Sequence, residues 1–246
     1  MKAVILAGGM GKRLRPLTDR YPKPLLQVSG VPIILWQLNW LKQNNVTDVV
    51  MLVGHLKEKI INYVNDGSRF GMNIDFVLEK TPLGTGGALK NAKTKLEDEQ
   101  KFVMINGDIL TNLNLRKLFG RVDKEIKASI AVVPLQSSFG VIDIADDDKI
   151  QCFREKPLLD GYWMNAGVYC LSASIFDYLP DEGNIEATAF PKLAAEGDLK
   201  AVRYTDAFWI SIDSHKDMES AARELENDLD VVAKNYHLKR RKIHSE

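Results

Sequence analysis

The chain has 246 residues, enough for one large α/β domain or two small ones. Its 33 Lys and Arg residues balance its 33 Asp and Glu residues, so no net field points to nucleic acid or a membrane surface as a partner. Two cysteines are too few for a disulfide framework or a zinc cluster, and no apolar run approaches the roughly 20 residues of a membrane span, so we expect a cytoplasmic protein.

The predicted elements begin with an apolar run, residues 3–6, which is typical of a buried parallel strand. It leads into a glycine turn, residues 8–11, whose three glycines allow a sharp bend and expose backbone N–H groups to a ligand. Arg13, Arg15 and Lys23 add cations, a combination that favours a polyphosphate. The stretch fits neither the P-loop, which needs Ser or Thr where Arg13 stands, nor the dinucleotide fingerprint, which needs a glycine where Leu14 stands.

Helices and strands then alternate along the first half of the chain. We predict helices over 32–43, 56–64 and 84–92, and strands over 49–53, 73–78 and 102–105. This alternation predicts a doubly wound parallel sheet, which binds ligands at the carboxyl ends of its strands. The glycine turn, residues 79–87 and Asp108 all fall at such ends, so we expect them to converge on one crevice.

The second half is richer in strands, which we predict over 128–133, 139–144, 150–154, 167–171, 199–204 and 208–212. Helical stretches are expected near 173–179 and 186–196, and a last helix begins at 217. The basic run 239–242 is more typical of a frayed end than of a nucleic-acid site.

The glycine turn and the residues behind it resemble the signature of sugar-1-phosphate nucleotidyltransferases (nucleoside-diphosphate-sugar pyrophosphorylases). The chain reads Gly8-Gly9-x-Gly11-x-Arg13-Leu14-x-Pro16-Leu17-Thr18, followed by Pro22-Lys23-Pro24. It departs from the family at Lys12, where Thr or Ser is usual. In pattern it is most similar to the mannose-1-phosphate and manno-heptose-1-phosphate guanylyltransferases.

This resemblance implies an α/β fold, a Rossmann-like doubly wound mixed sheet with a strand-rich sugar-binding part. We expect a single domain over 1–230, with a nucleotide-binding part (1–126) and a sugar-binding part (127–215), followed by a tail (231–246). The chain lacks hexapeptide repeats, so the β-helix of some relatives is not expected.

The resemblance also implies the reaction: an NTP donates its nucleoside monophosphate to a sugar 1-phosphate, and pyrophosphate leaves. Arg13, Lys23 and Asp108 are the implied catalytic residues. The implied nucleotide-binding residues are Leu6, Ala7, Gly8, Gly9, Gly11, Lys12, Arg13, Glu79, Pro82, Gly84 and Thr85. The last four belong to a second glycine-rich loop, and the N-terminus of the helix that follows it favours anionic groups.

Glu79 bears on the nucleobase, because thymidylyl- and uridylyltransferases of the family commonly have Gln there. Guanine offers two adjacent donors, N1–H and the N2 amine, which a carboxylate accepts as a pair. Uracil and thymine place one N3–H between two carbonyl oxygens that a carboxylate would repel. The sequence therefore favours GTP. UTP or dTTP with glucose 1-phosphate remains the alternative, and backbone groups could read the base instead.

Asp108 and Asp213 each follow an apolar strand, and the family resemblance assigns Asp108 to Mg²⁺. One or two carboxylates plus phosphate oxygens are how this ion is usually held. The family expects a second aspartate in an Asp-Ile-Gly motif, but the chain reads Ser211-Ile212-Asp213. Strict alignment puts Ser211 in its place, while Asp213, two residues on, faces the same side of a strand. A helix N-cap is the ordinary structural alternative for either aspartate.

The resemblance places the sugar and its phosphate against Gly140, Glu155, Lys156 and Asn165. The expected partners are thus an NTP and a sugar 1-phosphate, and assembly into a homo-oligomer is compatible with the sequence. Two rival functions stay open. A regulatory subunit that senses nucleotide sugars should have lost charged residues of the phosphate site, and a glycosyltransferase should carry Asp-x-Asp at a strand end, whereas residues 146–148 read as a hairpin turn.

Overall fold

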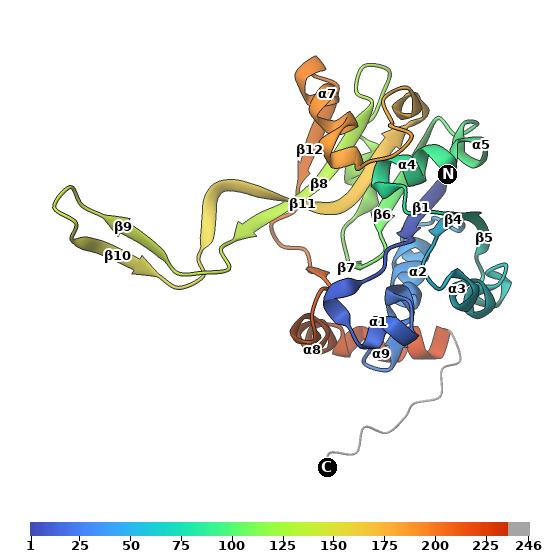
Figure 1. Cartoon of the computed structure of the whole chain (residues 1–246), viewed down its shortest axis with the longest axis horizontal. Coiled ribbons are helices and arrows are strands. Elements are labelled where there is room, and N and C mark those ends of the chain that lie inside the picture. Colours follow the sequence, from blue (N-terminus) through green and yellow to red (C-terminus); the bar gives the residue numbers. More distant parts are fainter. Residues whose placement is uncertain (236–246) are drawn as a thin grey trace, which may run out of the picture.

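The structure, a computed structural model, describes residues 1–235. Seven strands form the central sheet in the order β12-β8-β11-β6-β1-β4-β5 (Figure 1). Their bounds are β1 Lys2–Ala7, β4 Asp48–Val53, β5 Asn73–Leu78, β6 Lys101–Asn106, β8 Ala128–Gln136, β11 Leu158–Ser172 and β12 Leu199–Arg203. Only β11 runs antiparallel to its neighbours, β6 and β8; the other pairs are parallel. The predicted doubly wound mixed sheet is therefore confirmed.

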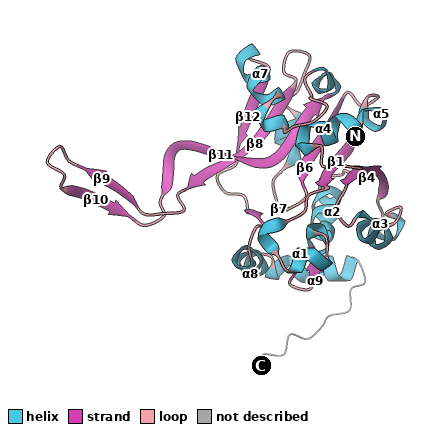
Figure 2. Ribbon diagram, in the orientation of Figure 1, coloured by secondary structure: helices cyan, strands magenta, loops and turns pink. Residues whose placement is uncertain are grey.

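Both faces of the sheet are buried, which explains why residues 3–7 of β1 are all apolar instead of alternating with polar residues. Ala3 and Ile5 belong to one hydrophobic core cluster, and Val4 belongs to the other. Helices cover the two faces (Figure 2). The cluster that contains Ile5 includes residues of α2 (Ile33–Gln43), α3 (Lys57–Val64), α6 (Leu115–Phe119), α8 (His215–Glu224) and α9 (Glu226–Asn235). The cluster that contains Val4 includes residues of α4 (Gly84–Asn91), α5 (Lys93–Leu96) and α7 (Ala189–Glu196).

The remaining elements are short. The helices are η1 (Lys12–Leu14), α1 (Leu17–Arg20), η2 (Lys23–Leu25), η3 (Ser68–Phe70), η4 (Ala173–Asp177) and η5 (Ile185–Ala187). Strand β2 (Gln27–Val28) pairs with β3 (Val31–Pro32), and β7 (Ile109–Thr111) pairs with β13 (Trp209–Ser211). No helix within residues 1–235 is long and apolar enough to cross a membrane.

Several predicted boundaries differ from the structure by a few residues, and two of these differences concern β11 and the last helix. The strand predicted over 167–171 is the end of the fifteen-residue β11, whose earlier part carries residues such as Gly161 that disfavour strands, and whose pairing with β8 shifts register twice. The last helix begins at His215, capped by Ser214, and continues as α9 to Asn235. Residues 231–235 of the expected tail are therefore helical, and 236–246 lie outside the described residues.

A hairpin of β9 (Val141–Ile144) and β10 (Ile150–Arg154) projects away from the central sheet (Figure 1). We call residues 137–162 the arm; it comprises this hairpin, its two connections and the start of β11. The predicted turn at residues 146–148 forms its tip.

Candidate active site

A cavity of about 430 Å³ opens at the carboxyl ends of β1, β5 and β6. Its wall contains every residue that the sequence assigned to nucleotide, metal or catalysis: Leu6, Ala7, Gly8, Gly9, Gly11, Lys12, Arg13, Lys23, Glu79, Pro82, Gly84, Thr85, Asp108 and Asp213. The expected convergence on one crevice is confirmed.

The glycine turn exposes its backbone to this cavity. Gly11 has a φ of +59°, in the left-handed region that favours glycine, and its carbonyl accepts a hydrogen bond from the Thr18 hydroxyl at 2.9 Å. The N–H groups of residues 9–12 have no hydrogen-bond acceptor within the described part of the chain. Successive free N–H groups form a concavity suited to an anion.

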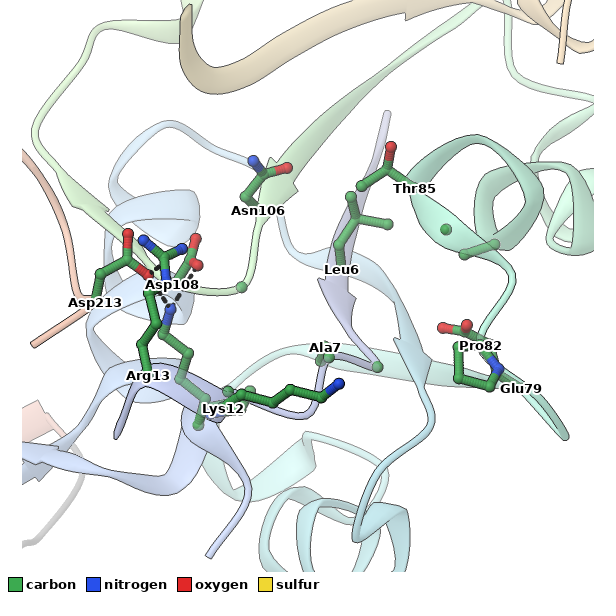
Figure 3. A pocket seen from close by; sticks show the side chains of 18 of the residues that line it. Leu6, Ala7, Lys12, Arg13, Glu79, Pro82, Thr85, Asn106, Asp108 and Asp213 are labelled. Atoms are coloured by element: carbon green, nitrogen blue, oxygen red, sulfur yellow. Dashed lines mark hydrogen bonds and ion pairs between the residues drawn. The ribbon is translucent and has the colours of Figure 1, made fainter. Parts of the chain in front are cut away.

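Four charged side chains meet beside this turn, at the end of the cavity away from Glu79 (Figure 3). The Lys23 ammonium contacts Asp108 Oδ2 at 2.7 Å and Asp213 Oδ1 at 2.9 Å, and Arg13 Nη2 contacts the same Asp213 oxygen at 3.0 Å. The two carboxylates therefore bracket one cation although they lie more than 100 residues apart in the chain. Oxygen ligands that already surround a positive group are the donor set that a hard divalent cation needs.

Strand pairing brings Asp213 to this point. β13 runs antiparallel to β7 with Ser211 opposite Ile109, and the N–H of the buried Ile212 donates to the carbonyl of Asp108 at 2.9 Å. The next residue, Asp213, thus lies beside Asp108. The Ser211 hydroxyl donates to Asp213 Oδ2 at 3.2 Å, so the serine supports the carboxylate of the aspartate.

Asp213 is held in its ionised form. Partial burial pushes the pKa of its carboxyl upward, but the hydrogen bond from Lys23 and the charges of Lys23 and Arg13 outweigh burial, and the net pKa lies below the usual value. The backbone N–H of Asp213 also donates to Asp217 at 2.9 Å, which fixes the turn into α8. The carboxylate therefore stays available as an anionic ligand at neutral pH.

Glu79 occupies the other end of the cavity, directly after β5. Burial raises the pKa of its carboxyl, and the hydrogen bond from the Leu83 N–H at 3.3 Å opposes this only in part. A Cβ on Gly8 would collide with this carboxylate, so any larger residue in the turn would have to displace the Glu79 side chain. No ion pair to Glu79 is present within residues 1–235. Its two carboxylate oxygens are therefore available at the cavity as hydrogen-bond acceptors.

The first-turn N–H groups of α4 donate to groups of the protein itself. The Thr85 N–H donates to Asn184 Oδ1 at 3.2 Å, and the N–H groups of Gly86 and Gly87 donate to the Gly183 carbonyl at 2.9 and 3.2 Å. A loop distant in sequence thus already satisfies three of the first-turn donors, and binding of an anionic group at this helix end stays a prediction.

Gly140, Glu155 and Lys156, which were expected to bind the sugar and its phosphate, lie on the arm and do not line the cavity. The exposed side chains of Glu155 and Lys156 approach each other at 3.9 Å. Their binding role stays a prediction.

Asn165 is not part of the wall either, but it belongs to a hydrogen-bond chain that ends there. Its Nδ2 donates to the Tyr169 hydroxyl at 2.9 Å, which lies 3.3 Å from Glu186 Oε1. Glu186 Oε2 accepts from the Thr85 hydroxyl at 2.6 Å, and Thr85 lines the cavity.

Sequence reasoning missed six residues of the wall: Leu14, Pro24, Ala88, Asn106, Gly107 and Asn184. Asn106 and Gly107 directly precede Asp108, so strand-end position could have identified them. The buried Asn106 Oδ1 has no hydrogen-bond partner within the described residues. Asn184 had no local signal, because only its long-range bond to Thr85 brings it to the cavity.

Comparison with known proteins identifies a matching family model and several similar sequences. The family model described as "Nucleotidyl transferase" matches residues 2–228. Probable mannose-1-phosphate guanylyltransferase 1 of Oryza sativa is 35% identical over 232 residues, and mannose-1-phosphate guanylyltransferase of Mycobacterium tuberculosis is 32% identical over 232 residues. Each match covers 91% of this chain and 64% of the relative, so the chain spans less than two thirds of these proteins.

A solved structure matches almost end to end. HddC from Yersinia pseudotuberculosis, complexed with GMP-PN, shares 31% sequence identity with a TM-score of 0.70. The match covers 91% of this chain and 99% of that chain.

Proposed function

We propose that this chain, which belongs to the nucleotidyl transferase family, transfers the nucleoside monophosphate of GTP to a sugar 1-phosphate and releases pyrophosphate. The observation that carries the proposal is the single cavity, which combines free turn N–H groups, the cluster of Lys23, Arg13, Asp108 and Asp213, and Glu79 at the far end. The names of the two guanylyltransferase relatives and the GMP-PN complex of HddC support guanine as the base.

The attacking group is an oxygen of the sugar phosphate. Its second pKa is about 6, so it is mostly ionised at neutral pH and needs no general base. Catalysis then comes from alignment and from charge neutralisation at the α-phosphate. Arg13 and the turn N–H groups hold the leaving β- and γ-phosphates, and Lys23 stabilises the charge that develops at the α-phosphate.

Mg²⁺ fits the same cluster. Asp108 and Asp213 provide two carboxylate ligands, and no group of three or more His, Cys, Asp or Glu within residues 1–235 offers a complete protein cage. The substrate phosphates complete the coordination in sites of this kind. When bound, the ion neutralises phosphate charge and fixes the position of the α-phosphate.

A panel assay tests the function: pyrophosphate release from each of four NTPs with mannose, manno-heptose and glucose 1-phosphates. The proposal predicts turnover with GTP and a manno-configured sugar phosphate. A preference for UTP or dTTP with glucose 1-phosphate would establish the alternative. Binding of a nucleotide sugar without turnover of any pair would identify a regulatory subunit. We place the reaction in the cytoplasm, where the unpaired Cys152 and Cys170 stay reduced.

The Glu79→Gln variant tests base recognition. The amide offers one donor and one acceptor, which suits the N3–H and a carbonyl of a pyrimidine. It leaves one of the two guanine donors without an acceptor. We expect the ratio of kcat/KM for GTP over UTP to fall about ten- to a hundredfold, because losing a charged acceptor for a buried donor costs about 1.5–3 kcal/mol. An unchanged ratio would assign base recognition to the loop backbone.

The Ser211→Ala variant separates the serine from the aspartate beside it. It removes one hydrogen bond to Asp213 and leaves the contacts of Asp213 with Lys23 and Arg13 intact. We expect kcat/KM to fall by about ten- to a hundredfold at most, since a hydrogen bond to a charged group contributes about 1.5–3 kcal/mol. Asp213→Asn, measured beside it, should lose far more. Equal losses would mean that Ser211 itself is the ligand.

A further inference from the structure

Gln37 is a polar side chain in the most buried part of a helix. The residues of α2 from Ile33 to Leu41 are all buried, and Gln37 in their middle is 1% exposed. Burying a side-chain amide costs free energy unless its polar atoms find hydrogen-bond partners. An apolar side chain of the same length would fill the same space, so packing alone does not account for a glutamine at this position.

The amide nitrogen of Gln37 spans the turn that carries Asp108. It donates at 2.9 Å to the carbonyl of Asn106 and at 2.9 Å to the carbonyl of Ile109. These two residues flank Gly107 and Asp108, so one side chain holds the turn at both ends. Both N–H bonds of the amide are used in this way. A flipped amide would direct its oxygen at two carbonyl oxygens, so the two acceptors set the orientation of the side chain.

The backbone of the same turn is tied to two strands. The N–H of Gly107 donates to the carbonyl of Leu6 in β1 at 2.9 Å, and the carbonyl of Asp108 accepts from the N–H of Ile212 at 2.9 Å. The second of these bonds leads directly into Asp213. A shift of the turn would therefore move both carboxylates of the proposed magnesium site, which lie side by side in Figure 3.

The helix that carries Gln37 is itself firmly held. Trp40, on the next turn of α2, donates its indole N–H to the Leu113 carbonyl at 2.9 Å, and Trp36 donates to the Val28 carbonyl at 3.3 Å. The apolar residues of α2 all belong to one hydrophobic core cluster. A side chain that projects from such a rigid element keeps the groups that it contacts in one place, as the supports of a metal site must.

We propose that Gln37 is a positioning residue for the magnesium site: its amide fixes the turn that carries Asp108 and, through the bond from Ile212, also fixes Asp213. The part that concerns the metal rests on the proposed function, whereas the order of the turn depends only on contacts within the chain. Gln37 does not line the nucleotide cavity, so it acts on the substrates only through the two aspartates.

Hydrogen exchange measured by mass spectrometry tests the order of the turn. The variant is Gln37→Met, which keeps the length of the side chain but has no N–H donor. We expect peptides that contain Gly107 and Asp108 to exchange at least about tenfold faster. The control is Trp40→Phe, which removes a buried bond of the same length from the same helix, but at Leu113. It should leave those peptides within about threefold of the wild type, and circular dichroism checks that both variants fold.

Metal affinity tests the consequence for the site. Water-proton relaxation measures the affinity for Mn²⁺–GTP, with Mn²⁺ as the paramagnetic probe in place of Mg²⁺. Changes to groups that support metal ligands typically cost about ten- to a hundredfold in metal affinity, and we expect this loss for Gln37→Met. The affinity of this variant for GTP in the presence of EDTA should stay within about threefold of the wild type, because the glycine turn and Glu79 are unchanged. A general loosening of the fold would weaken both affinities alike.

Three results would each overturn the inference: unchanged exchange of the Asp108 turn in Gln37→Met, unchanged affinity for Mn²⁺–GTP, or an equal loss of both affinities. The proposed function is decided separately, by turnover of the wild type. A wild type that transfers no nucleotide would refute that function, and the exchange of the Asp108 turn would still decide the role of Gln37.

Discussion

The Asp108→Asn variant is expected to lose at least about 100- to 1,000-fold in kcat at saturating substrates, the range measured when one preorganised electrostatic group is removed. The amide keeps the shape of the side chain but not the charge that contacts Lys23 at 2.7 Å and that the proposed Mg²⁺ site requires. The melting temperature should shift by no more than about 2–4 °C, because a partly exposed pair contributes about 1 kcal/mol or less. Steady-state kinetics measures kcat, and thermal unfolding measures the melting temperature.

The matched control for this variant is Asp75→Asn. Asp75 also pairs with a lysine, Lys95 at 3.2 Å, but does not line the cavity. It should keep full activity. Undiminished turnover of Asp108→Asn at saturating magnesium would remove Asp108 from the site.

The Lys23→Met variant should lose about 100- to 1,000-fold in kcat with less than about a tenfold change in the affinity for GTP. Lys23 lies between the two carboxylates, and its proposed role is to stabilise charge that develops at the α-phosphate. Only interactions that are stronger in the transition state than in the ground state accelerate the step. Equilibrium binding of GTP and single-turnover rates separate the two effects.

Lys95→Met is the corresponding control, since it removes the same charge from the Asp75 pair. If the entire loss in Lys23→Met is found in GTP affinity, then Lys23 is a binding residue and contributes nothing specific to the transition state.

Local sequence patterns were sufficient where a residue's position follows from its own element. The apolar run before the glycine turn correctly predicted strand β1. Ligands bind at the carboxyl ends of parallel strands, and this rule correctly predicted that Asp108 and Glu79 lie at the same edge of the sheet. These positions depend on chain direction and burial, which periodicity reveals.

Long-range pairing could not be predicted in the same way. Asp213 reaches Asp108 only because β13 pairs with β7, and the α4 N-terminus is occupied only because a loop near Gly183 packs against it. The extension of β11 into the arm was missed because Gly161 and its neighbours disfavour strands, and only pairing with β8 holds them extended. Tertiary contacts of this kind leave no periodic signal.

The central claim is that the cavity aligns two substrates for direct attack by the sugar phosphate, with no nucleophile from the protein. Exchange of radiolabelled pyrophosphate into GTP tests it most directly. The account predicts no exchange with GTP, Mg²⁺ and pyrophosphate alone, and rapid exchange once the sugar 1-phosphate is added. Exchange in the absence of sugar 1-phosphate would reveal a covalent nucleotidyl enzyme and would contradict the account.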